Sequence, residues 1–210
     1  RDDAPELFDV RRFRHDWEKH ASLQLRLGDA AVIDTYMDHG RVAGGDRDQM
    51  LDSAYQAWMR DQTAGKVSVL IAETIETVID LNERARSDRI LTGLVADGGV
   101  RLHDGTRASA GDVVITRQND RRLALGRGWV KNNDRWHVTE AHEDGSLTVR
   151  REKSRWRSTI TLPAPYVANH VDLGYAITAH RAQGATVDTA HAVVASPEMT
   201  REALYVAMTR

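Results

Sequence analysis

The sequence contains no cysteine among its 210 residues, which excludes disulfide bonds and cysteine-ligated zinc and agrees with a reducing compartment. It has no apolar run of membrane-spanning length, and its first ten residues lack the apolar core of a secretion signal. We therefore expect a cytoplasmic protein that does not contact a membrane. The nine histidines are scattered along the chain, so no metal site is expected.

The sequence also has little excess of either charge, because 29 Lys and Arg against 31 Asp and Glu leave a net charge of -2. The overall charge therefore gives no sign of nucleic-acid binding. Residues 101–160 differ from the rest, since they hold 13 Lys and Arg against 8 Asp and Glu. A local excess of this kind can mark a nucleic-acid surface, although a solvated basic face is the commoner explanation.

Apolar residues recur with helical spacing through residues 1–65, in segments that end at Gly28, Gly40 and Gly65. The pattern then changes to a short apolar run over residues 66–73, which is rich in β-branched residues and typical of a buried parallel strand. Thr74 is a suitable N-cap for a helix over residues 77–90. A strand followed by a capped helix predicts a βα unit of an α/β sheet.

Between residues 98 and 165, short β-type runs alternate with turn residues, and the runs that flank residues 143–145 predict a hairpin. Several short strands at close spacing predict a small antiparallel barrel. From Gly174 the α/β pattern returns. We therefore expect an α/β lobe in two parts, residues 1–100 and 167–210, interrupted by a β-barrel over residues 101–166. The last residues have a helical pattern with no stop signal, so we expect a fragment of a longer protein.

The segment of most chemical interest is residues 174–188, in which an apolar strand end leads into a tight turn at Gly184. It presents a hydroxyl, an imidazole, a guanidinium and a carboxamide, from Thr178, His180, Arg181 and Gln183. Such donors beside free backbone amides are suited to phosphate oxygens. On residue types alone, a polar strand-to-helix turn with a structural glycine is the simpler explanation.

This segment resembles the T-x-H-x-x-Q-G block of RecD-like superfamily-one DNA helicases. Residues 204–210 (Leu-Tyr-Val-Ala-Met-Thr-Arg) follow in the same order as in that family and are similar to its final motor block. Residues 7–13 resemble the block that opens the second motor lobe. The resemblance covers nearly the whole chain and implies the α/β fold of a RecA-like (P-loop NTPase-type) second lobe, of the UvrD-like C-terminal kind.

The resemblance also implies contacts with ATP. In the family, the arginine of the final block acts as a finger on the terminal phosphate, and an arginine of the opening block contacts the phosphates. An arginine suits this role because it stays charged and its planar fork grips phosphate oxygens. Carried over, the catalytic residues are Arg210 and Arg12, and the further ATP contacts are Gln183, Gly184 and Arg11. From the residues alone, Arg210 could be an exposed helix-terminal arginine and Arg12 part of a basic helix start.

Two features depart from a complete motor. Nothing in the sequence matches G-x-x-x-x-G-K-[ST], and no Asp-Glu pair ends a strand as a magnesium-binding block. Those elements belong to the first lobe of the family, so the resemblance implies that ATP and Mg²⁺ are bound mainly by an upstream lobe and that this chain alone is inactive. Thr186 stands where many relatives carry an acidic residue, which puts a nucleotide-sugar contact there in doubt.

Residues 111–119 and 130–138 are similar to the SH3-like barrel inserted in the second lobe of RecD-like helicases, where the barrel and its preceding hairpin help hold single-stranded DNA. Trp129 or Trp136 could stack on a base, although the alternating pattern around Trp136 favours a core position. Arg121 and Arg122 could meet phosphates. The expected contacts with DNA are Thr178, His180, Arg181, Arg117, Asn119 and Lys131.

Short matches over residues 73–74, 81–86, 111–112 and 162–167 are especially similar to the helicase region of conjugative relaxases of the TraA/TraI kind. We therefore expect the C-terminal motor half of an ATP-dependent single-stranded-DNA translocase or helicase, with 5′-to-3′ polarity implied by the family. Its partners would be single-stranded DNA and the upstream RecA-like lobe of the same protein. Two alternatives stay open: a non-catalytic single-stranded-DNA-binding module derived from a helicase lobe, and an α/β interaction domain with no nucleic-acid role.

Overall fold

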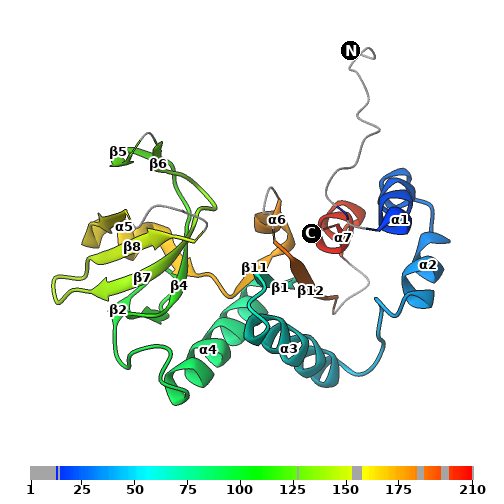
Figure 1. Ribbon diagram of the computed structural model, residues 1–210, viewed down its shortest axis with the longest axis horizontal. Helices are drawn as coiled ribbons and strands as arrows, with labels where there is room; N and C mark the ends of the chain where they lie inside the picture. The colour runs from blue at the N-terminus through cyan, green and yellow to red at the C-terminus, as the bar shows by residue number, and fades with distance from the viewer. Residues whose placement is uncertain are drawn as a thin grey trace, which may run out of the picture.

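The computed structural model describes residue 13 and residues 15–126, 128–152, 158–183, 187–194 and 199–209. Residues 15–91 and 175–209 form an α/β unit around a three-stranded parallel sheet, and residues 98–174 form a β unit around a five-stranded antiparallel sheet. The two units lie side by side (Figure 1). The chain enters the β unit from the α/β unit and then returns to it.

Three helices open the described chain: α1 (Asp16–Leu27), α2 (Val32–Asp38) and α3 (Arg47–Thr63). Gly28 ends α1 in the left-handed conformation with a φ of 81°, and its backbone N–H donates to the carbonyl oxygen of Leu25. Gly40 and Gly65 also have positive φ angles, just beyond α2 and α3. The helices and their glycine ends are therefore confirmed for the described part of residues 1–65.

The parallel sheet has β1 (Ser68–Ala72) at its centre, paired with β11 (Ala176–Thr178) on one side and β12 (Thr189–Val193) on the other. The next element is α4 (Ile75–Leu91), whose N-cap Thr74 accepts a hydrogen bond from the Thr77 N–H at 3.2 Å. All five residues of β1 are buried. The predicted βα unit, a buried strand followed by a Thr74-capped helix, is therefore confirmed. A strand that is buried throughout needs cover on both faces of its sheet.

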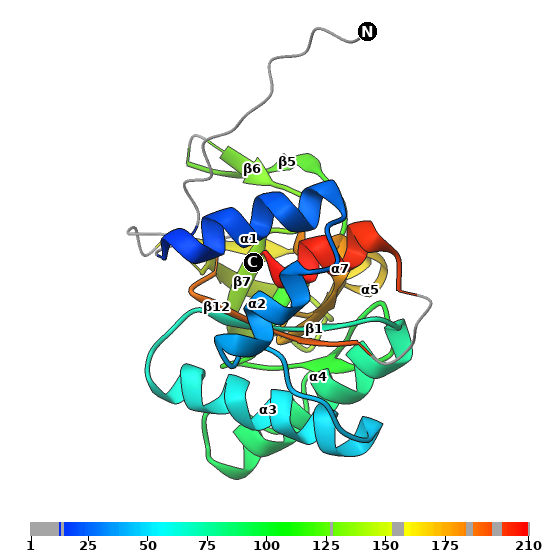
Figure 2. The same cartoon turned by 90° about the vertical axis from the view of Figure 1, so that its right-hand side faces the viewer.

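Helices supply that cover. The long helices α3 and α4 lie against one face of the parallel sheet, while α6 (Ala179–Ala182) and α7 (Arg201–Met208) lie on the other (Figures 1 and 2). On the far side of α7, the α1 and α2 pair packs against it (Figure 2).

The main sheet of the β unit has the strand order β10-β4-β7-β8-β9. Its strands are β4 (Val113–Thr116), β7 (Arg135–Ala141), β8 (Leu147–Arg151), β9 (Thr159–Leu162) and β10 (Val171–Leu173). The hairpin predicted around residues 143–145 is confirmed as β7–β8. Two smaller hairpins and one helix complete the unit: β2 (Val100–Arg101) with β3 (Arg107–Ala108), β5 (Asp120–Leu125) with β6 (Gly128–Val130), and α5 (Ala164–His170).

Among the residues that the structure describes, the strands do not close into the predicted SH3-like barrel. Within the described residues, the outer strands β10 and β9 do not pair with each other, so the main sheet is open. Strand β10 pairs with β4 although it lies beyond residue 166, where the sequence suggested that the α/β pattern resumes. Its three residues, Val171, Asp172 and Leu173, are all buried, and so short a run cannot show whether its partners are parallel or antiparallel.

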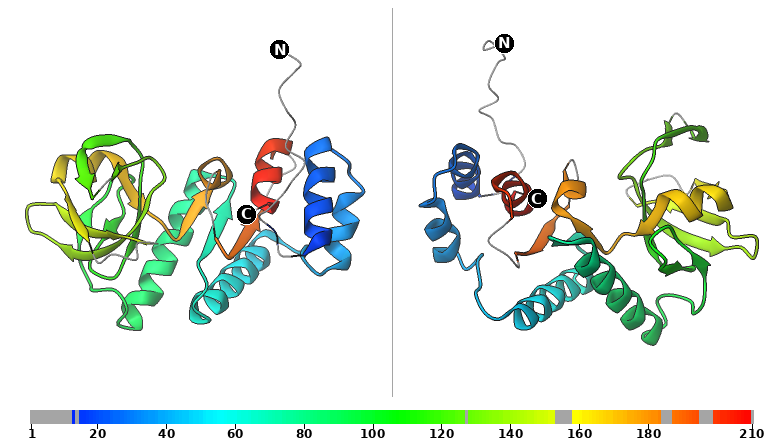
Figure 3. Two further views of the ribbon diagram at one scale, coloured as in Figure 1. Left: turned by 45° about the horizontal axis from the view of Figure 1, so that its top comes forward. Right: turned by 180° about the vertical axis from the view of Figure 1, so that it is seen from behind.

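One buried core continues across the two units. Tyr55 and Trp58 of α3 belong to the same buried cluster as Val113 and Trp136 of the β unit. Tyr175, which directly precedes β11, belongs to it too. Trp136 is fully buried and its indole N–H donates to the Thr116 hydroxyl at 3.3 Å, which confirms the core position that the alternating pattern favoured. Figure 3 shows α4 running from one face of the parallel sheet towards the β unit, and its Arg86 donates to Asp112 there. The β unit is therefore packed on the α/β unit and shares its core.

Candidate functional site

The segment that resembles the helicase block lies where β11 ends and the short helix α6 begins. Ala179 and Ala182 are buried in the same apolar cluster as Ile115 of β4. This cluster joins α6, the parallel sheet and β4 of the β unit. Small residues at these two positions allow the close approach of helix and sheet.

Because the two alanines face inward, the polar residues of the segment face outward. His180 and Gln183 are exposed, while Arg181 is half-buried. Thr178 is half-buried at the N-cap of α6, and its hydroxyl makes no capping hydrogen bond with the helix. Hydroxyl, imidazole, guanidinium and carboxamide groups are thus presented within a single short turn, which is an arrangement suited to phosphate oxygens.

Two buried side chains hold the backbone that leads into β11. The Asn82 Oδ1 accepts hydrogen bonds from the N–H groups of Tyr175 at 3.0 Å and Ala176 at 2.8 Å. The Tyr175 hydroxyl donates to the Asp112 Oδ1 at 2.7 Å, and the Asp112 Oδ2 accepts from the Arg86 Nε at 3.0 Å. Burial raises the pKa of the Tyr175 phenol, and the Asp112 carboxylate raises it further, so the hydroxyl stays a donor. Helix α4 and the β unit therefore fix the start of the segment.

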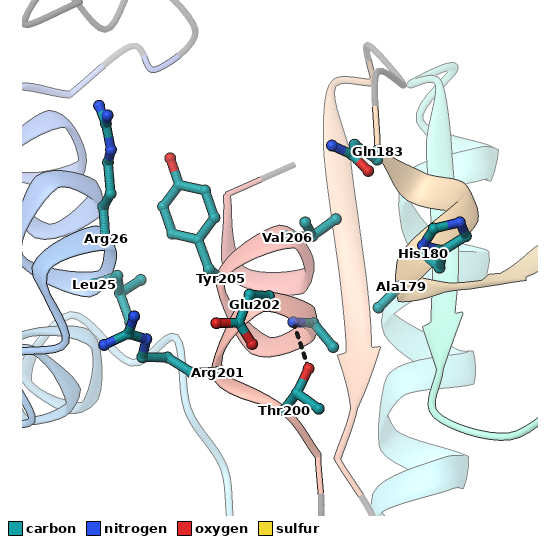
Figure 4. Close-up of a pocket in the computed structure, with 11 residues that line it drawn as sticks. Leu25, Arg26, Ala179, His180, Gln183, Thr200, Arg201, Glu202, Tyr205 and Val206 are labelled. Carbon is teal, nitrogen blue, oxygen red and sulfur yellow. Dashed lines mark hydrogen bonds between the residues drawn. The ribbon is translucent and has the colours of Figure 1, made fainter. Parts of the chain in front are cut away.

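A pocket of about 490 Å³ opens between α1, α6 and α7 (Figure 4). His180 and Gln183 line it from α6, and Arg26 and Tyr205 line it from α1 and α7. The Arg26 and Tyr205 side chains point towards the same end of this α6–α7 pocket, and Gln183 lies across from them (Figure 4). Cationic, amide and phenol groups at one opening are donors suited to an anionic ligand.

The start of α7 is held against the end of α1. The Thr200 hydroxyl caps α7 by accepting the Ala203 N–H at 3.2 Å (Figure 4). A Cβ added to Gly28 would lie 2.6 Å from the Arg201 Nη1, so the absence of a side chain at Gly28 leaves room for this guanidinium. A cation near the C-terminal end of α1 also favours the helix dipole.

Three basic side chains from both units converge on Asp172 of β10. The Arg181 Nη1 donates to the Asp172 Oδ2 at 2.6 Å, and the Arg117 Nε lies 3.6 Å from the same oxygen. The His103 Nδ1 lies 3.1 Å from the Asp172 Oδ1, and its ring also contacts the Arg117 Nη1. We call these four residues the Asp172 cluster. It brings together Arg117 and Arg181, two of the expected DNA contacts.

The other two expected contacts of the β unit flank the β5–β6 hairpin. The Asn119 Oδ1, before β5, accepts the Asn132 N–H at 3.1 Å. The Lys131 Nζ, after β6, lies 5.1 Å from the centre of the half-buried Trp129 ring, and the Arg121 guanidinium lies 5.4 Å from it. An indole ring with two cations beside it has the chemistry to stack on a base and to hold its phosphates.

Sequence reasoning missed the two members of the cluster that do not resemble any motif, Asp172 and His103. Each is a single polar residue in a short strand or turn, and no spacing pattern marks it. The sequence also gives no sign of a role for Tyr205 within the final motor block, or for Arg26 and Arg201 within helical patterns. These three residues line the α6–α7 pocket only because α1 and α7 pack together.

Most of the expected ATP contacts, namely Arg11, Arg12, Gly184 and Arg210, lie outside the described residues, and so does Thr186. Gln183 lies within them. Among the residues that the structure describes, no three histidine or acidic side chains are grouped to hold a metal ion. None of the described helices is both long enough and apolar enough to cross a bilayer.

No family model matches the chain, but curated proteins do. A probable conjugal transfer protein TraA of Sinorhizobium fredii (strain NGR234) is 34% identical over 209 residues, which cover 98% of this chain and 18% of that protein. The conjugal transfer protein TraA of Agrobacterium fabrum is 33% identical over the same shares of both chains. The chain thus spans less than a fifth of the length of these relatives.

A solved structure of Pif1 helicases, from work on DNA unwinding at forked double-stranded DNA, matches the fold with a TM-score of 0.54. The match covers 96% of this chain and 46% of that one, at 18% sequence identity. At this identity the likeness establishes the fold alone, a mixed α/β fold like the RecA-like domain of Pif1. The resemblance to conjugative relaxases of the TraA kind is therefore confirmed: over almost its whole length, this chain is homologous to one segment of the TraA conjugal transfer proteins, and its fold is similar to that of part of a Pif1 helicase.

Proposed function

We propose that this chain is the C-terminal motor half of an ATP-dependent single-stranded-DNA translocase or helicase within a conjugative relaxase-helicase. The likeness to TraA proteins and the Pif1-like fold support the proposal. The observation that carries it is the placement of two motif-bearing helices. Helix α6, with the T-x-H-x-x-Q-G block, and helix α7, with the final motor block, line the same pocket.

In this proposal, Arg210 and Arg12 act on the terminal phosphate of ATP held by an upstream RecA-like lobe of the same protein. Their guanidinium groups would stabilise the negative charge that spreads over the phosphoryl oxygens in the transition state. Arg11, Gln183 and Gly184 would complete the contacts of this lobe with the nucleotide. ATP hydrolysis would supply the free energy for movement.

The described side chains of the α6–α7 pocket are suited to the phosphates of ATP. The amide of Gln183 and the guanidinium groups of Arg26 and Arg201 line the α6–α7 pocket and suit a polyphosphate. Among the described residues, no three histidine or acidic side chains are grouped to hold a metal ion. In this proposal, Mg²⁺ is held mainly by the upstream lobe, as the family resemblance implies.

Single-stranded DNA would be gripped by both units through its phosphates. Thr178, His180 and Arg181 would contact it from the α/β unit, and the β unit, in the role of an SH3-like insertion, would add Arg117, Asn119 and Lys131. Contacts of this kind give little sequence preference and a marked dependence on salt. Each closing and opening of the cleft between the lobes would then advance the strand, with the 5′-to-3′ polarity of the family.

The test is DNA-stimulated ATP hydrolysis by the protein extended upstream to include the whole preceding lobe. Arg210→Ala should lower the stimulated rate by about 10³-fold or more, which is the usual effect of losing an arginine finger. Arg84→Ala is the matched control. Arg84 lies on α4, on the opposite face of the parallel sheet from α6 and α7, and its ion pair with Asp52 is partly exposed.

Three results would count against the proposal in different ways. Hydrolysis that survives Arg210→Ala would remove the finger assignment. DNA binding without any hydrolysis would favour the non-catalytic single-stranded-DNA-binding module. Neither binding nor hydrolysis would favour an interaction domain with no nucleic-acid role.

A further inference from the structure

We infer that Asp172 positions Arg117 and Arg181 to form a single binding site for a backbone phosphate of single-stranded DNA, at the junction of the α/β unit and the β unit. The inference rests on the proposed function, because it names a contact of the same DNA grip. It goes further in treating two separate contacts as one site and in giving Asp172 and His103 a part in it.

The geometry of the Asp172 cluster sets the two arginines side by side. Both guanidinium groups approach the same carboxylate oxygen, the Asp172 Oδ2, at 2.6 Å from Arg181 and 3.6 Å from Arg117. Asp172 itself is almost buried, with 9% of its side chain exposed, whereas the side chains of Arg181 and Arg117 are 23% and 34% exposed. The carboxylate therefore lies beneath the guanidinium groups, which reach the surface.

The charges of the cluster do not cancel. One carboxylate would be neutralised by one guanidinium, so the second arginine leaves an excess of positive charge at the surface. Within the described part of the chain, the Arg181 guanidinium makes one hydrogen bond, to Asp172, and this uses one of its five N–H groups. N–H groups of both arginines can therefore fork onto phosphate oxygens while Asp172 holds the two side chains.

The backbone fixes the distance between the two arginines. Arg117 follows β4, and Asp172 is paired with Ile115 in the β10–β4 ladder, so Arg117 and Asp172 are diagonal neighbours on one face of the sheet. Arg181 is carried by α6, whose buried Ala179 belongs to the same apolar cluster as Ile115 of β4. The site is therefore built on packed elements rather than on a loose loop.

His103 closes the other side of the cluster. Its backbone N–H donates to the Val171 carbonyl at 3.0 Å, and its ring lies against both the Asp172 Oδ1 and the Arg117 Nη1. The ring thus limits where the Arg117 guanidinium can move. Because Arg181 comes directly after His180 on α6, the site also adjoins the segment that resembles the helicase block.

The experiment measures the affinity of a fluorescein-labelled oligo(dT) of 20 nucleotides by fluorescence anisotropy, over a range of salt, for the upstream-extended protein. Arg117→Ala and Arg181→Ala should each weaken binding by about tenfold and reduce the slope of log affinity against log salt by about 0.7 per lost phosphate contact. Because both residues serve one phosphate, the double variant should weaken binding by much less than the product of the two single effects.

Asp172→Asn distinguishes a positioning role of the Asp172 carboxylate from a mere effect of its negative charge on DNA binding. Removing a negative charge strengthens binding to DNA if the cluster acts only through its net charge, whereas loss of the positioning carboxylate weakens it. We expect binding weakened by about tenfold, as for the arginine variants. Asp52→Asn and Arg84→Ala are the matched controls, since they break a partly exposed Arg–Asp pair on the far face and should leave affinity unchanged.

The outcomes are distinguishable from failure of the proposed function. If the unaltered protein does not bind oligo(dT), the proposed function fails and the inference fails with it. If it binds, but the cluster variants bind as tightly as the controls or Asp172→Asn binds more tightly, the inference alone is overturned. If Asp172→Asn unfolds the protein, Arg117→Ala is the deciding variant, because the Arg117 side chain is partly exposed. Affinity for oligo(dT) equal to that of the controls would then overturn the inference. Weaker binding of a fluorescent ATP analogue by the arginine variants would assign the site to nucleotide phosphates and would also overturn the inference.

Discussion

Gly28, at the end of α1, leaves room for the Arg201 guanidinium at the start of α7. Its φ of 81° lies in the left-handed region, where a side chain costs about 1–2 kcal/mol. A Cβ there would also meet the Arg201 Nη1 at 2.6 Å. The guanidinium is flexible and can move aside, so most of the cost of a side chain at residue 28 comes from the backbone.

Gly28→Ala should therefore lower the free energy of unfolding by about 1 kcal/mol or slightly more. Urea unfolding followed by tryptophan fluorescence measures the change. Gly44→Ala is the matched control, because Gly44 has no positive φ and no atom within 4 Å of an added Cβ, so its stability should be unchanged or slightly raised. Equal stabilities of the two variants would show that the Gly28 conformation is not needed.

Residues with nearby partners were predictable from the sequence, and residues with distant partners were not. Thr74 caps α4 through Thr77, three positions along, and a threonine before an apolar run indicates this directly. Asp172 meets Arg117 only because β10 pairs with β4, and no local pattern contains that pairing. The sequence could indicate both arginines as DNA contacts through the family resemblance, but not that they share a carboxylate.

At the scale of elements, Asp61 attaches α3 to the edge strand β12. Its Oδ2 lies 2.9 Å from the His191 Nε2, and its Oδ1 accepts from the Lys66 Nζ at 2.6 Å. Burial raises the pKa of Asp61, but hydrogen bonds from Lys66, Thr189 and His191 outweigh it and lower the pKa to about 2. The carboxylate therefore stabilises the contact of α3 with β12 in its charged form.

Asp61→Asn should lower the free energy of unfolding by about 1–2 kcal/mol at neutral pH. The sign follows from the lowered pKa: the contribution of the carboxylate is present above pH 4 and is lost as the pH falls from about 4 to 2. Urea unfolding of the variant and the unaltered protein across this range should show the difference shrinking. A constant Asp61→Asn difference down to pH 2 would refute the assignment.

The elements themselves were largely predictable where their pattern was strong. The apolar, β-branched run of β1 and the turn between β7 and β8 both gave the correct strands. The closure of the β unit was not predictable, because strand patterns indicate which faces are buried and not which outer strands meet. The structure resolves this as an open five-stranded sheet with β10 at one edge and β9 at the other.

At the scale of the whole molecule, Asp112 joins the two units in a buried network. It is fully buried and accepts hydrogen bonds from the Arg86 Nε, the Ser109 N–H and the Tyr175 hydroxyl. Arg86 belongs to α4, Ser109 to the β unit, and Tyr175 to the connection that returns to the parallel sheet. The unfolding of one unit therefore removes partners from the other.

Asp112→Ala should lower the free energy of unfolding by about 3–5 kcal/mol, because it leaves a largely buried guanidinium without its carboxylate. The unaltered protein should unfold in one transition, with the same midpoint by far-ultraviolet circular dichroism and by tryptophan fluorescence. Asp52→Ala, at a partly exposed ion pair, should cost less than about 1 kcal/mol. Two separate transitions in the unaltered protein would contradict the coupling of the units.

The most direct test of the motor assignment is displacement of a labelled strand from a duplex with a 5′ single-stranded tail, by the protein extended to include its upstream lobe. The motor assignment predicts displacement that requires ATP, is much slower with a 3′ tail, and is lost with Arg210→Ala but kept with Arg84→Ala. Failure to displace the strand despite tight binding to the tail, or displacement that does not depend on ATP, would contradict it.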